Sequence, residues 1–112
     1  CFRAGYGTVL FFIDEAVNKK YQELFPSYAE NFPVWAHHSS GMHQFAVWTM
    51  LEELGLGVTL QPYTPLMDEE VPEEWKLDTN WCLVAQMPFG RPVAAAGPKE
   101  FDPIDKRSLL FE

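Results

Sequence analysis

The segment of residues 39–66 constrains the fold of this chain more than any other part of the sequence. It predicts a helix over residues 41–54, which Ser40 caps and Gly55 ends, and then a short extended segment over residues 58–61. Apolar side chains surround most of this helix: Phe45, Ala46, Val47, Trp48, Met50, Leu51 and Leu54. Because such a helix must be covered on most sides, the segment predicts a core shared with a second chain and a ligand where the helix ends.

The composition bounds the size of the fold and excludes two classes of partner. The 112 residues suffice for one domain, and 15% of them are aromatic, which favours a partner surface beside a modest core. A net charge of −8 argues against nucleic acid and against an anionic membrane as partners. A cluster of acids indicates a solvated face, because its spacing lacks the pattern of a calcium loop: Asp68, Glu69, Glu70, Glu73, Glu74 and Asp78.

The cysteines and the chain ends suggest a cellular setting. Cys1 and Cys82 form neither a disulfide framework nor a metal-ligand spacing. No signal peptide or membrane-spanning apolar run is visible, so we expect a reducing, cytoplasmic environment. Because the chain opens almost directly on a buried type of strand, we expect it to be a fragment of a longer protein.

Two apolar runs predict strands. Residues 8–13 are a continuous run of β-formers, which is typical of a strand buried on both faces. Residues 81–87 are the second run, which follows a turn signal at residues 78–80. We expect Pro88 and Gly90 to close this second strand.

The remaining elements are predicted by caps and breakers. Asp14 is expected to cap a helix that Pro26 ends and whose apolar face comprises Val17, Tyr21, Leu24 and Phe25. Residues 27–38 predict a loop or short turns that carry aromatic side chains, and residues 71–76 predict a short helix. Residues 101–111 predict a short tail, so that the order is strand, helix, loop, helix, strand and tail.

The polar residues offer little catalytic chemistry. His37, His38 and His43 invite a metal site, but they lack a clean helical ligand spacing and no HExxH motif occurs, so surface or interface histidines are favoured. Ser39 and Ser40 lack the GxSxG setting of a nucleophile. The glycine-rich loops that bind nucleotides, GxGxxG and GxxxxGK, are absent from the sequence.

Two features remain that could bind a ligand. Gly55 and Gly57 let the backbone turn sharply, which would leave the amides of the next few residues free to face a flat ligand. Lys106 and Arg107 are a basic pair in an acidic chain and could bind a phosphate. A plain helix C-cap and a solvated basic pair stay open as alternatives, and spacing alone favours them.

Five blocks of the sequence resemble, in this order, the nitroreductase-like flavoproteins, in particular the fatty-acid-repression-mutant branch: AGYGTVLFF, FPSYAENFPVW, SSGMHQFAVWTMLEELGLGVTLQPYTPL, WCLVAQMPFG and KEFDPIDKRSLLF. The resemblance implies an α+β fold, a three-layer sandwich of the FMN-dependent nitroreductase-like type, in partial form. Residues 1–112 would be the C-terminal portion of that single domain. It also implies an intertwined homodimer with FMN at the interface.

The resemblance further implies a cofactor site. The backbone amides of Thr59, Leu60 and Gln61 would face the flavin ring, and Arg107 would reach the flavin phosphate. Pro62 departs from the family pattern and has no N–H to donate. No catalytic side chain and no metal is implied, because the flavin itself would take hydride from NAD(P)H and pass electrons to a small acceptor in ping-pong fashion. Nitroaromatics and quinones are the acceptors that the family implies.

Two other functions stay open at this stage. One is a non-catalytic remnant or interaction module that keeps the fold and the shared helix but binds no flavin. The other is a small-ligand or lipid-responsive binding protein that uses the same apolar surface.

Overall fold

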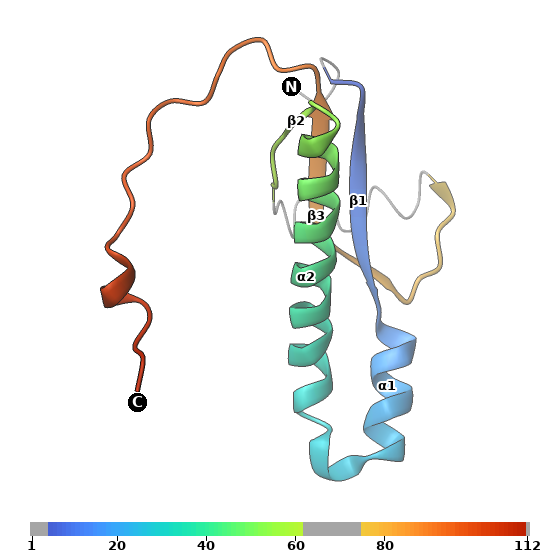
Figure 1. Ribbon diagram of the computed structural model, residues 1–112. Coiled ribbons are helices and arrows are strands. Elements are labelled where there is room, and N and C mark those ends of the chain that lie inside the picture. The colour runs from blue at the N-terminus through green and yellow to red at the C-terminus, as the bar shows by residue number, and fades with distance from the viewer. Residues whose placement is uncertain (1–4, 62–74, 112) are drawn as a thin grey trace.

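The computed structural model describes residues 5–61 and 75–111 and has a three-stranded antiparallel sheet at its centre (Figure 1). The strands are β1 (Gly7–Asp14), β2 (Gly57–Val58) and β3 (Trp81–Gly90), and their order in the sheet is β1-β3-β2. The two long predicted strands are confirmed. The expected helix over residues 71–76 lies mainly outside the described residues, as does most of the acidic cluster.

The end predicted for the central strand is wrong. Pro88 and Gly90 lie inside β3 rather than after it. Pro88 lacks an N–H, but it still pairs with Thr8 of β1, and its carbonyl accepts a hydrogen bond from the amide of Thr59 at 3.2 Å. The strand tolerates proline here because the neighbour on that side, β2, is short and few ladder bonds are lost.

A β-bulge divides the long β1–β3 pair. Phe11 pairs with Ala85, whereas Phe12 pairs with Leu83, so Val84 is the extra residue. Phe11, Ala85 and Met87 form the buried core beneath the long helix, and Met87 is 0% exposed.

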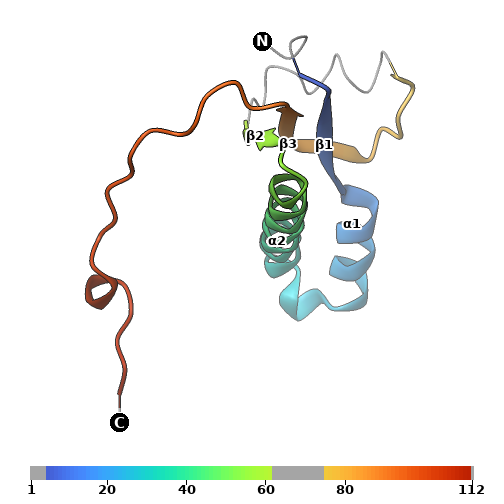
Figure 2. The same ribbon diagram turned by 45° about the horizontal axis from the view of Figure 1, so that its top comes forward.

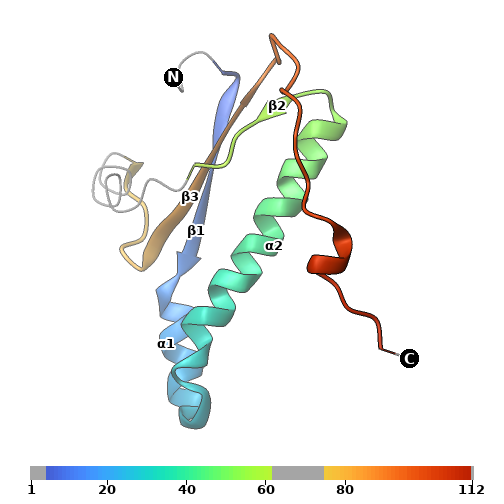
Figure 3. The same cartoon turned by 90° about the vertical axis from the view of Figure 1, so that its left-hand side faces the viewer.

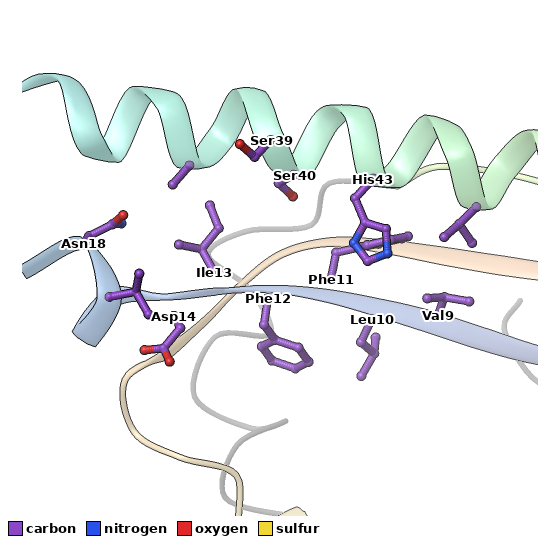
Figure 4. A pocket seen from close by; sticks show the side chains of 13 residues that line it. Val9, Leu10, Phe11, Phe12, Ile13, Asp14, Asn18, Ser39, Ser40 and His43 are labelled. Carbon is purple, nitrogen blue, oxygen red and sulfur yellow. The ribbon is translucent and has the colours of Figure 1, made fainter. Parts of the chain in front are cut away.

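Only one face of the sheet is covered by helices among the described residues (Figures 2 and 3). Phe11 and Ile13 are buried on this face, while Leu10 and Phe12 point the other way and stay half-buried (Figure 4). The expectation that residues 8–13 are buried on both faces is therefore wrong for the described part of the chain. The described residues form two layers, a sheet and a helical layer.

The cap and the end of the first helix agree with the sequence, but its predicted apolar face does not. The buried residue of the helix is Asn18, and the four side chains of that face are at least 44% exposed: Val17, Tyr21, Leu24 and Phe25. This helix is α1 (Glu15–Leu24), and its N-cap is Asp14, whose side chain accepts a hydrogen bond from the amide of Ala16 at 2.9 Å. The chain then passes through a short 3₁₀ helix, Pro26–Tyr28. Pro26 ends α1 because it cannot donate to a preceding turn.

The second helix is much longer than predicted. It is α2 (Asn31–Glu53), so the loop predicted over residues 27–38 is wrong for most of its length. Pro33 is the third helical residue, and its missing N–H is among the first four that have no partner within a helix. Ser40 is not a cap but an interior residue, whose hydroxyl accepts a hydrogen bond from the side chain of Gln44 at 2.9 Å.

The C-terminal end of α2 agrees with the sequence. Gly55 has a φ of +79°, the left-handed conformation that glycine adopts without strain. Its amide donates to the carbonyl of Glu52 at 2.9 Å, and the amide of Leu56 donates to the carbonyl of Leu51 at 3.1 Å. These two bonds form a Schellman motif, which turns the chain sharply into β2.

Residues after β3 leave the body of the molecule (Figures 1 and 3). Residues 91–103 lack regular structure, as predicted for most of that range, and a single 3₁₀ turn follows at Ile104–Lys106. Six apolar side chains of this tail are more than 70% exposed: Val93, Phe101, Ile104, Leu109, Leu110 and Phe111. Nothing within the described chain covers them.

No helix in the described ranges has both the length and the apolar character that crossing a bilayer requires.

Candidate functional site

The segment after Gly57 forms the outer edge of the sheet. The amide of Thr59 donates to the carbonyl of Pro88 at 3.2 Å, and the amide of Gln61 donates to the carbonyl of Gln86 at 2.8 Å. These two amides are therefore engaged with β3. The expectation that they are free to face a ligand is wrong in this structure, because residues 59–61 continue the strand pairing that β2 begins.

Leu60 differs from its two neighbours. Its side chain packs against the buried core with Val58, on the side of α2. Because successive amides of an extended chain point in opposite directions, the N–H of Leu60 points away from β3 and toward the open edge of the sheet. Among the described residues this N–H has no acceptor. Of the three amides predicted to face a ligand, it is the one that remains available.

Arg107 lies far from this edge. It directly follows the 3₁₀ turn Ile104–Lys106, and this turn of the tail lies well apart from β2 (Figures 1 and 2). Its backbone amide donates to the carbonyl of Ile104 at 3.0 Å, and its side chain is exposed. A single chain therefore does not bring Arg107 together with Thr59, Leu60 and Gln61.

A groove lies at the other edge of the sheet, between β1, α1 and α2 (Figure 4). Its volume is about 420 Å³, and its floor is apolar, with Val9, Phe11 and Ile13. Polar groups line its rim: Asp14, Asn18, Ser39, Ser40 and His43. The His43 ring meets Phe11 edge to face, with the ring centroids 5.6 Å apart. The groove is thus an amphipathic surface remote from β2.

Sequence reasoning did not predict this groove, since it treated residues 27–38 as a loop. A signal was available, because Ala36, Ser40, His43 and Val47 recur at helical spacing and share one face of α2. His37 and His38 are exposed on the same helix and do not line the groove.

The described residues offer no metal centre. Across residues 5–61 and 75–111, no three histidine, cysteine, aspartate or glutamate side chains gather as a metal site would require. Asp78 has a perturbed pKa, which lies below its ordinary value of 3.8 because the backbone amide and then the side chain of Asn80 donate to its carboxylate. This carboxylate belongs to the turn before β3, where the amide of Trp81 donates to the Asp78 carbonyl at 3.0 Å.

Comparison with known proteins identifies the family. The model of the nitroreductase family matches residues 2–91. Nitroreductase FRM2 of Saccharomyces cerevisiae is 39% identical over 101 residues, which are 90% of this chain and 51% of that protein. The chain spans about half the length of the curated relatives it matches.

Solved structures show the same fold. Nitroreductase CinD from Lactococcus lactis in complex with 4-nitrophenol is 49% identical and aligns with a TM-score of 0.95, over 99% of this chain and 59% of that one. A nitroreductase from Saccharomyces cerevisiae is 38% identical, with a TM-score of 0.71 over 80% of this chain and 49% of that one. These alignments confirm the expected α+β nitroreductase fold in partial form. The chain belongs to the nitroreductase family.

Proposed function

We propose that residues 1–112 are the C-terminal portion of a single nitroreductase domain that acts as an FMN-dependent oxidoreductase. The enzyme would transfer hydride from NAD(P)H to a nitroaromatic, a quinone or a similar small acceptor by a ping-pong mechanism. Family membership supports this proposal, as do the complexes of CinD with 4-nitrophenol, chloramphenicol and nicotinic acid, all of which are small aromatic compounds. The proposed location is the cytoplasm, with neither nucleic acid nor a membrane as partner.

The amide of Leu60 is the observation that carries this proposal. It projects from a sheet edge that no strand of the described residues covers, and the bonds of Thr59 and Gln61 to β3 hold it in place. A rigid N–H at an open edge suits an acceptor on the rim of a planar heteroaromatic ring. Bound FMN would supply the hydride chemistry, while the Leu60 amide would orient its ring, with Thr59 and Gln61 fixing that amide through their bonds to β3.

We further propose that the active form is an intertwined homodimer with FMN between the subunits. Arg107 would bind the flavin phosphate as a fixed, bidentate donor. Because one chain keeps Arg107 far from Leu60, the arginine of one protomer would serve the flavin on the sheet edge of its partner. Exposed apolar side chains on α2 and on the tail supply a surface for such an assembly, with Met42 and Phe45 both more than 60% exposed.

Titration of the purified chain with FMN, followed by flavin fluorescence and by reduction with NAD(P)H, tests the proposal. We expect saturable binding, and we expect Arg107→Ala to weaken it at least tenfold, since a charge-assisted hydrogen bond contributes roughly 1.5–3 kcal/mol. Lys99→Ala is the matched control, because Lys99 is an exposed cation of the same tail. Wild-type protein without FMN uptake would contradict the proposal. Equal losses in the two variants would contradict only the role of Arg107.

The groove favours a second candidate function, the binding of a small apolar ligand without flavin. Its volume of about 420 Å³ lies in the range of small-molecule sites, and its polar rim could orient an amphipathic compound. Displacement of a bound apolar fluorescent probe distinguishes the two functions. Release by an acyl carboxylate but not by FMN would favour this candidate. A protein that self-associates and binds neither compound would be the non-catalytic interaction module.

A further inference from the structure

Gln86 is a buried polar residue with an unusual environment. It lies in the central strand β3 and is only 4% exposed. Its backbone is fully paired, because its amide donates to the carbonyl of Gln61 at 3.1 Å and its carbonyl accepts from the amide of Gln61 at 2.8 Å. Its side-chain carboxamide, however, makes no hydrogen bond to any residue in the described ranges. Buried carboxamides are rarely left in this state.

The backbone pairing places a second carboxamide beside it. Gln61 and Gln86 form an antiparallel bridge, and residues paired in this way project their side chains from the same face of a sheet, with Cβ atoms about 5 Å apart. That face is the one turned away from α2, because the sequence neighbours Leu60, Ala85 and Met87 pack into the core. The two side chains therefore lie next to each other, beside the open edge to which the Leu60 amide points.

The chemistry of the carboxamide gives this pair a function. Each group has two N–H donors and a carbonyl acceptor, so it can present either end to a ligand. A donor is the useful end beside a ring that gains negative charge on reduction. Gln61 presents its N–H outward only if its own carbonyl is turned inward, and the buried N–H of Gln86 is placed to bond that carbonyl.

We propose that Gln86 is a positioning residue for the cofactor site. Its side-chain N–H donates to the carbonyl of the Gln61 side chain when the ring binds, so that Gln61 presents its own N–H to the polar rim of the ring. This inference rests on the proposed function, since it takes FMN as the ligand of the β2 edge. It extends that function by assigning a second layer of residues that favours the reduced ring over the oxidised one.

The test compares the affinities of the full chain for oxidised and for reduced FMN. In Gln86→Leu, we expect the ratio of reduced to oxidised affinity to fall about tenfold, which is about 30 mV for a two-electron couple. Gln86→Glu should lower the ratio further, because a carboxylate accepts and would turn the N–H of Gln61 inward. Gln44→Leu is the matched control, since Gln44 lies on α2 and bonds Ser40.

The outcomes separate this inference from the proposed function. A merely structural role predicts that Gln86→Leu changes the unfolding midpoint in urea and leaves the affinity ratio unchanged. That result, in a protein that binds FMN, would overturn the inference alone. Wild-type protein without any FMN uptake would overturn the inference together with the proposed function.

Discussion

The central strand β3 and the C-terminal tail are both rich in apolar residues, yet the apolar side chains are buried in the strand and exposed in the tail. Leu83, Ala85 and Met87 of β3 are no more than 3% exposed, whereas Val93 and Leu110 of the tail are at least 90% exposed. The strand lies between β1 and β2, which pair with its backbone, and its Ala85 and Met87 pack in the core beneath α2. The tail finds no such partner within the described chain. Apolar composition therefore predicts burial only where a neighbouring element can supply the other half of the contact.

The largest expected effect comes from placing the same charge in each region. Met87→Asp buries an unpaired carboxylate in the core and should destabilise the fold by at least about 4 kcal/mol. Val93→Asp, at a fully exposed position, should leave stability unchanged within about 0.5 kcal/mol. Urea unfolding at one protein concentration measures both. Similar losses in the two variants would break the comparison, because the tail would then be part of the core.

The same comparison applies to the two sides of α2. Trp48 packs against the core and donates to Glu52 at 2.7 Å, so its replacement would damage the fold as well as any interface. Phe45 is 69% exposed and offers a cleaner test. We expect Phe45→Asp to keep the fold but to weaken self-association by about 1.5–3 kcal/mol, the value of one buried aromatic side chain.

Sedimentation velocity of wild-type protein, Phe45→Asp and the equally charged control Thr79→Asp measures this effect. Thr79 lies in the turn before β3, remote from the outer side of α2. Monomeric wild-type protein would refute the shared-helix argument, whatever the variants do.

Two glycines allow a comparison of backbone conformation, because Gly55 is left-handed and Gly41 lies inside α2. Gly55→Ala forces an alanine into a left-handed conformation and should cost about 1–2 kcal/mol. Gly41→Ala, in the interior of α2 with open space around it, should stabilise the fold by about 0.5–1 kcal/mol. Thermal unfolding measures both substitutions. Effects of equal sign would mean that the Schellman turn does not persist in solution.

The smallest expected effect is a pH dependence at the turn that leads into β3. Asn80 lowers the pKa of Asp78 in the folded state below 3.8, so the folded protein binds fewer protons there than the unfolded chain. The resulting stability is present above the pKa of the unfolded chain and is lost as the pH falls through the lower pKa of the folded state. Melting temperatures of wild-type protein and Asp78→Asn, taken from neutral pH to about pH 2, should therefore converge at the acidic end. A gap that widens on acidification would contradict this sign.

The sequence predicted the elements whose signals are local. The strands, the Asp14 cap and the Gly55 turn follow from neighbouring residues and were all confirmed. Residues 31–40 of α2 were missed, because Pro33 resembles a helix breaker and Ser40 resembles an N-cap. Tertiary packing overrode both, since a proline in the first turn and a serine bonded within the helix cost little.

The candidate site was harder to predict than the fold. Residues 59–61 were located correctly as an extended segment, but which of their amides is free depends on pairing with β3, which lies 25 residues further along the chain. Arg107 follows the 3₁₀ turn of the tail, and the distance of this turn from β2 depends on the path of residues 91–103, which no local sequence signal predicts. Gln86 gave no signal in sequence, because one glutamine in an apolar strand is distinguished only by what the fold places opposite it.

The bulge at Val84 divides β3 into two parts, and the alternation of side chains between the two faces of the sheet is reversed from one part to the other. Before it, Leu83 pairs with Phe12 and faces away from α2; after it, Ala85 pairs with Phe11 and faces the helix. A single extra residue thus lets side chains two positions apart project from opposite faces of the sheet. It follows that deleting Val84 would not simply shorten the strand. It would move the side chains of residues 81–83 each to the opposite face of the sheet.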